Sequence, residues 1–178
     1  SSDLMIPYSY MVIDTHSLFQ AELSEAFDLV KSCGYEGVEL NLFPGLAADS
    51  TRLEQALATS GLTLPSLLTG AAYSDGLCLS SADSGVRQAA VSYLKDCIEL
   101  AQRFQAILVV GLVQGLRIDE PDPVIAHGRI VAAHQHVGVP LLRAGVALVI
   151  AHMNRPPTGR STWRADGPPT LGVVSCPA

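Results

Sequence analysis

The sequence predicts an α/β domain in which parallel strands alternate with helices. Short β-branched or apolar stretches alternate with helix-like stretches along most of the 178 residues. One of them, residues 106–111 (AILVVG), is apolar apart from its glycine, which is typical of a parallel strand covered on both faces. The length corresponds to one domain, and a hydrophobic content of 48% is sufficient for a buried core.

The first β/α unit begins with residues 6–13, whose β-branched and aromatic side chains favour a strand. Ser24 is expected to cap the following helix, which places Cys33 on its apolar side and stops at Gly34. Residues 37–42 (GVELNL) then form the second strand.

The second helix is expected to start at Asp49 or Ser50 and to stop at Gly61. Residues 62–68 form the third strand, and residues 69–80 are predicted to be a long loop that contains glycine.

The third helix, within residues 81–104, shows the clearest helical periodicity of the chain. A fourth helix is expected near residues 124–137, where Gly138 and Pro140 interrupt it, and residues 146–151 form the fifth strand. Cys97 lies on the apolar side of the third helix, and like Cys33 it is expected to be a thiol buried in the core. The residues of this apolar side are Val86, Ala90, Leu94, Cys97, Ile98 and Ala101.

Composition excludes several classes of function. A net charge of −6 with only two lysines argues against a protein that tracks nucleic-acid phosphates. No apolar run approaches the length of about 18 residues that a membrane helix needs. The four cysteines lack C-x-x-C spacing, so we expect reduced thiols and a cytoplasmic protein.

Two regions are predicted from the distribution of proline and glycine. Residues 1–155 form a partial domain of β/α units, whereas residues 156–178 form a C-terminal tail rich in both residue types.

The alternation of strands and helices is compatible with two architectures, a doubly wound sheet and part of a barrel. Both architectures place a site at the carboxyl ends of the strands.

Two residues at those strand ends are candidate substrate ligands. Glu39, on the second strand, is expected to bind a substrate hydroxyl, or else to pair with a neighbouring loop. His16, after the first strand, is a candidate ligand for sugar or phosphate, or else a solvated loop histidine. His134 and His136 are two residues apart on a predicted helix, so they face different sides and are not expected to share a metal.

Three segments resemble the xylose isomerase-like sugar phosphate isomerase/epimerase family. They are residues 34–41 (GYEGVELN), residues 81–104 and residues 144–158 (AGVALVIAHMNRPPT), and the resemblance extends over about residues 5–158. The resemblance implies a TIM-type barrel that binds a sugar or sugar phosphate. It also implies a divalent metal (Mn²⁺, Mg²⁺, Co²⁺ or Zn²⁺), which assists proton transfer between adjacent carbons.

The fifth-strand motif of that family, E-x-x-N-R-x-E-T, is only partly present. Its metal-binding glutamate falls on Ala151 and its second glutamate on Pro157. Asn154 and Arg155 match, and the resemblance implies that they bind substrate or orient the loop. We therefore expect no metal site in this chain.

A complete barrel needs about 250 residues, so the sequence predicts an incomplete one of about five strands. The resemblance favours a sugar or sugar-phosphate isomerase/epimerase, and the replacement of its metal-binding glutamate by Ala151 counts against activity of this chain. The alternatives are a non-catalytic α/β fragment and a DNA-repair relative similar to endonuclease IV. Because an open sheet exposes its edge strands, we expect a homo-oligomer, with no nucleic-acid or membrane partner.

Overall fold

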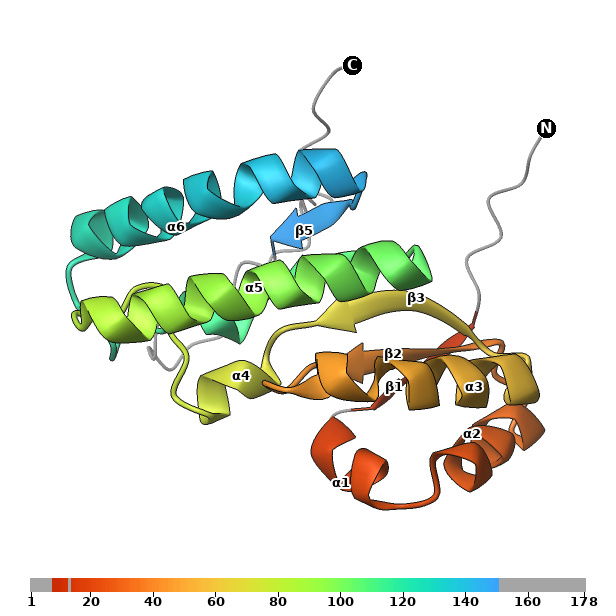
Figure 1. Ribbon diagram of the computed structural model, residues 1–178. Helices are drawn as coiled ribbons and strands as arrows, with labels where there is room; N and C mark the ends of the chain where they lie inside the picture. The colour runs from red at the N-terminus through yellow and green to blue at the C-terminus, as the bar shows by residue number, and fades with distance from the viewer. Residues whose placement is uncertain (1–7, 13, 151–178) are drawn as a thin grey trace, which may run out of the picture.

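The computed structural model describes residues 8–12 and 14–150, which form a five-stranded parallel sheet with helices packed on it (Figure 1). The strands are β1 (Ser9–Val12), β2 (Gly37–Asn41), β3 (Thr63–Leu68), β4 (Ile107–Val110) and β5 (Leu148–Ile150). The helices are α1 (Thr15–Gln20), α2 (Leu23–Ser32), η1 (Leu46–Asp49), α3 (Ser50–Ser60), α4 (Ala71–Ser74), α5 (Ser84–Phe104), η2 (Leu112–Gln114) and α6 (Pro123–Ala144).

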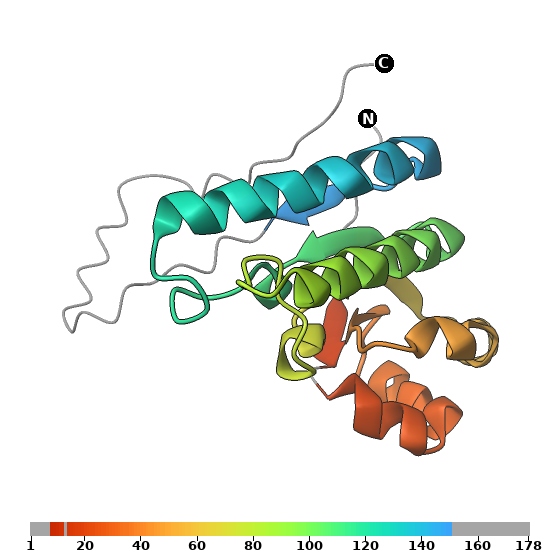
Figure 2. The ribbon, with the colours of Figure 1, turned by 60° about the vertical axis from the view of Figure 1, so that its left-hand side comes forward.

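The strands lie side by side in sequence order, β1-β2-β3-β4-β5. Because each new strand is added on the same side, right-handed crossovers place the long helices on one face of the sheet (Figure 2). This arrangement is that of successive β/α units in a barrel wall. The predicted α/β class and the incomplete barrel are therefore confirmed.

The two faces of the sheet differ in burial. On the face beneath the helices, Val38, Leu40 and Leu108 are completely buried. The other face, which we call the open face, carries Glu39, flanked in register by Met11 on β1 and Ser66 on β3. Successive strand residues point to opposite faces of the sheet. The residues that face the helices are apolar and buried, so the core lies between the sheet and the helices.

Two short helices are absent from the sequence-based prediction. The segment 69–80 was expected to be a loop, but it contains α4, and α1 follows β1 directly. Helix α1 starts because the Asp14 carboxylate accepts a hydrogen bond of 3.0 Å from the Ser17 backbone N–H. Helices of four and six residues are too short to show a helical period in the sequence.

The last helix is longer than predicted. Instead of ending at Gly138, α6 continues through Pro140 to Ala144. Proline removes one backbone hydrogen bond, but packing compensates for this loss because Val137 is buried and Leu141 packs against the core. No helix within residues 8–12 and 14–150 is long and apolar enough to cross a membrane.

The two predicted core thiols behave differently. Cys97 is buried, and burial raises the pKa of its thiol to about 12. Cys33 is exposed, contrary to the prediction, because it occupies the C-cap position beyond the last residue of α2. The buried side of α2 is formed by Leu23 and Phe27, whereas Leu29 is exposed.

A half-buried histidine on α6 should make stability depend on pH. The Nδ1 of His134 donates to the Ile130 carbonyl at 2.9 Å, and within the described part of the chain its buried Nε2 has no partner. Burial lowers the pKa of His134, and the Ile130 hydrogen bond opposes this only in part. The unfolded chain therefore binds a proton at higher pH than the folded one.

We expect the free energy of unfolding to fall as the pH decreases below about 6.5, the usual pKa of histidine. His134→Leu should remove this dependence between pH 6.5 and 5.5, with stability at pH 8 changed by less than about 1 kcal/mol. Urea denaturation at several pH values measures both quantities. His127→Gln, at an exposed position of the same helix, is the control and should leave the slope unchanged.

Candidate functional site

The carboxyl end of the sheet is fixed by polar side chains that join neighbouring strand ends. Thr69 follows β3 and is completely buried. Its hydroxyl donates to the Val109 carbonyl at 3.2 Å and accepts from the Gly111 backbone N–H at 3.3 Å. The hydroxyl thus joins the ends of β3 and β4, which is a structural role.

Asn41 makes the corresponding connection at the end of β2. Its side-chain Oδ1 accepts from the Ala71 backbone N–H at 2.8 Å, and its own backbone N–H donates to the Thr15 hydroxyl at 3.1 Å. Asn41 therefore positions both α1, which follows β1, and α4, which follows β3.

Two further side-chain pairs hold the long loops above β3 and β4. The Tyr73 hydroxyl donates to both oxygens of Asp119, at 3.0 and 3.2 Å. Arg129 donates to the Glu120 carboxylate at 2.7 Å and to the Ser80 carbonyl at 2.8 Å. Desolvation and the Asp119 carboxylate raise the pKa of Tyr73, so its phenol stays protonated and donates.

Neither pair was predicted from the sequence. Tyr73 and Asp119 are 46 residues apart, and the sequence offers no sign of their pairing beyond the presence of acidic residues in the loop after β4.

Glu39 is the sequence-predicted site residue that the structure describes in full. It lies half-buried on the open face, in the middle of β2 and two residues before its last residue, Asn41. Within the five described strands it is the only Asp, Glu, Lys, Arg or His. Its neighbours in register, Met11 and Ser66, leave its carboxylate beside one apolar and one hydroxyl side chain.

The remaining predicted residues are less fully described. His16 is the second residue of α1, directly after β1, so it belongs to a helix and not to the predicted loop. Asn154 and Arg155 lie outside the described residues, as does Ala151. The structure therefore places the backbone of His16 beyond the carboxyl end of β1. Glu39 lies in the middle of β2, paired with Met11, and not at the strand end that the sequence predicted. Asn154 and Arg155 are not tested.

A family model described as xylose isomerase-like TIM barrel matches residues 27–165, which is more than half of the chain. The chain belongs to the xylose isomerase-like TIM-barrel family. Comparison of the chain with curated protein sequences gives no match.

Sugar epimerases are among the solved structures similar to this family member. The 3-keto-D-glucoside 4-epimerase YcjR from E. coli has a TM-score of 0.65 at 14% identity, over 83% of this chain and 56% of the epimerase. A D-psicose 3-epimerase, crystallised in the presence of D-fructose, has a TM-score of 0.61 at 15% identity, over 84% and 53%.

The D-allulose 3-epimerase from Methylomonas sp., in complex with D-allulose, has a TM-score of 0.58 at 16% identity, over 84% of this chain and 52% of the enzyme. At such identities the likeness establishes the fold. The chain spans about half the length of these structures.

The divalent metal that this family implies does not fit the described residues. Within residues 8–12 and 14–150, no group of three or more His, Cys, Asp or Glu side chains is arranged to hold a metal ion. On the strands, Glu39 offers a single carboxylate, whereas a hard divalent cation takes about six oxygen ligands. We therefore derive no chemical step from a metal.

Proposed function

We propose that this chain supplies the first β/α units of a sugar isomerase or epimerase and that its open face binds the hydroxyl groups of a ketose. Membership of the xylose isomerase-like family supports the proposal, as does the similarity of its fold to epimerases of D-psicose and D-allulose. The single observation that carries it is the position of Glu39, the one acidic or basic side chain on the five described strands.

Glu39 is suited to binding and orienting substrate. A carboxylate accepts hydrogen bonds only, and two adjacent hydroxyl groups of a sugar can donate to its two oxygens. Moving a proton between adjacent carbons needs a second acid/base group as well. The described strands offer Glu39 alone, so we propose that this part of the family fold recognises the sugar and that catalysis needs further groups.

We expect Glu39→Gln to weaken binding of D-allulose about tenfold, because charge-assisted hydrogen bonds are replaced by neutral ones worth about 1.4 kcal/mol less. NMR titration of the amide resonances measures the affinity. Glu36→Gln makes the same chemical change at an exposed residue directly before the amino end of β2 and should have no effect. Equal affinities for the wild type and both variants would refute the role of Glu39.

The edges of the sheet favour self-association as a second property of the chain. In the described sheet, β1 and β5 each have a neighbour on one side only. Three apolar side chains on these strands are exposed: Tyr10 (45%), Met11 (48%) and Ile150 (38%). Unpaired strand edges with exposed apolar side chains favour pairing with another chain, so we propose a homodimer or larger assembly.

Light scattering after size exclusion at low micromolar concentration should therefore give a mass of at least twice 18.8 kDa. Ile150→Lys should shift the equilibrium toward the monomer, because a charge on an edge strand opposes pairing. Ile118→Lys places the same charge on an exposed loop residue and should leave the mass unchanged. A monomeric wild-type protein would contradict the proposal.

A further inference from the structure

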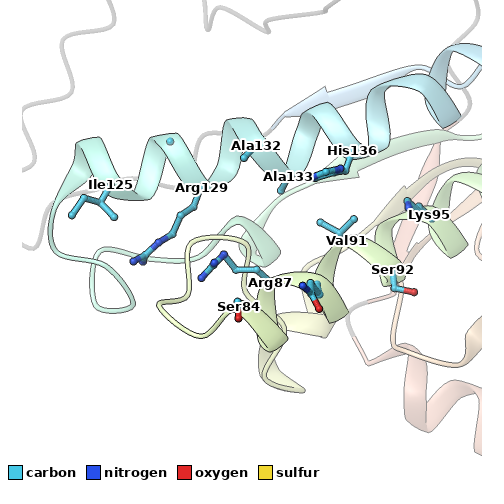
Figure 3. A pocket seen from close by; sticks show the side chains of 12 residues that line it. Ser84, Arg87, Val91, Ser92, Lys95, Ile125, Arg129, Ala132, Ala133 and His136 are labelled. Atoms are coloured by element: carbon cyan, nitrogen blue, oxygen red, sulfur yellow. The ribbon is translucent and has the colours of Figure 1, made fainter.

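A groove of about 730 Å³ runs between α5 and α6 on the outer surface of the molecule (Figure 3). It lies on the helical side of the sheet, whereas Glu39 lies on the open face. The α5 side of the groove presents Arg87, Val91 and Lys95, which are four residues apart and so share one side of the helix. The groove is therefore separate from the proposed sugar site.

The groove combines an apolar floor with room for another chain. Val91 and Ala133 lie between the two helices in Figure 3. The α6 side also presents Ala132 and Gly128, whose small size keeps the groove open, and Ile125, which is 46% exposed. Exposed apolar surface of this kind in a concave site is typical of a binding groove.

The charge of the groove is positive although the chain as a whole is negative. Arg87, Lys95 and Arg129 line it, and no Asp or Glu is among its lining residues. Arg129 is paired with Glu120. Arg87 donates to two backbone carbonyls, and among residues 8–12 and 14–150 no carboxylate forms an ion pair with it.

Beyond Lys95 the groove continues into a smaller hollow of about 260 Å³. Lys95 and Arg143 line this hollow together with one acidic residue, Glu99, so basic side chains still outnumber acidic ones there.

We propose that this groove binds an acidic amphipathic helix of a partner protein. Arg87 and Lys95 are eight residues apart, about 12 Å along α5, which matches carboxylates seven or eight residues apart on a facing helix. Apolar side chains between those carboxylates would lie on the floor formed by Val91 and Ala133. An amphipathic helix in a hydrophobic groove is a recurrent mode of recognition.

Charge distinguishes this occupant from two others. Residues 151–178 of the same chain contain Arg155, Arg160 and Arg164 against a single acid, Asp166, so they carry the same sign of charge as the groove. A second copy that presented α6 would bring the same sign too, because α6 contains arginine and no acid. An acidic helix of a partner protein brings the complementary sign of charge.

The probe for the test is a fluorescein-labelled 15-residue helical peptide with leucines along one face and two glutamates seven residues apart. Fluorescence anisotropy with the full chain should show saturable binding that weakens with salt. The same peptide with glutamine for glutamate should bind at least fivefold more weakly. Replacing both Arg87 and Lys95 with glutamate should weaken binding of the acidic peptide at least tenfold.

The charge swap separates recognition from loss of folding. A peptide with lysine for glutamate should bind the R87E/K95E variant and not the wild type, which an unfolded variant could not reproduce. Lys31→Glu, an exposed residue of α2, is the matched control and should bind the acidic peptide normally. Equal binding of the acidic and lysine peptides by the wild type would overturn the proposal. A loss of self-association in R87E/K95E would also overturn it, in favour of a second copy as the occupant.

Discussion

Replacing Gly115 with alanine is expected to lower the free energy of unfolding by about 3–5 kcal/mol, combining backbone strain with overpacking. Gly115 has a φ of +99°, which favours glycine. An added Cβ would lie 2.0 Å from the Ser80 Oγ and 2.7 Å from the Cys78 Sγ. Both of these residues are buried, so neither side chain can easily move away.

Gly45 is the matched control, because its φ is +98° and no atom lies within 4 Å of its hypothetical Cβ. Gly45→Ala therefore adds the backbone strain without the steric clash and should cost only about 1–2 kcal/mol. Urea denaturation followed by circular dichroism measures both variants. Equal losses of stability would show that the close approach of the loop after β4 to residues 78–80 is unimportant.

Phe27→Ala is expected to cost about 3–5 kcal/mol, because it leaves a large cavity in the core. Phe27 is only 1% exposed and belongs to the side of α2 that packs in the hydrophobic core. Without this anchor, α2 loses much of its attachment to the sheet that carries Glu39.

Leu29→Ala on the same helix is the control, since Leu29 is 66% exposed. Its replacement should change stability by less than about 0.5 kcal/mol. The midpoints of urea denaturation of the wild type and the two variants measure the loss of stability that each substitution causes. A similar, small effect of both substitutions would mean that α2 does not contribute to the cooperative core.

Local patterns were sufficient for the regular elements. The run at residues 106–111 predicted β4, and the three- and four-residue spacing of apolar side chains predicted α5, because a buried face repeats with the period of its element. The same reasoning failed for α1 and α4, which are too short to repeat. It also ended α6 too early, since packing of Val137 outweighs the local effect of Pro140.

The sequence by itself determined the α/β class, the order of the β/α units and the presence of one glutamate on the second strand. These properties depend on residues that are close together in the chain. Three features were decided only by the tertiary structure. Tyr73 forms a hydrogen bond with Asp119, Thr69 joins two strand ends, and basic side chains line a groove between α5 and α6. Such contacts join residues far apart in the sequence, and their geometry is set by the packing of helices on the sheet, which leaves no periodic trace in the chain.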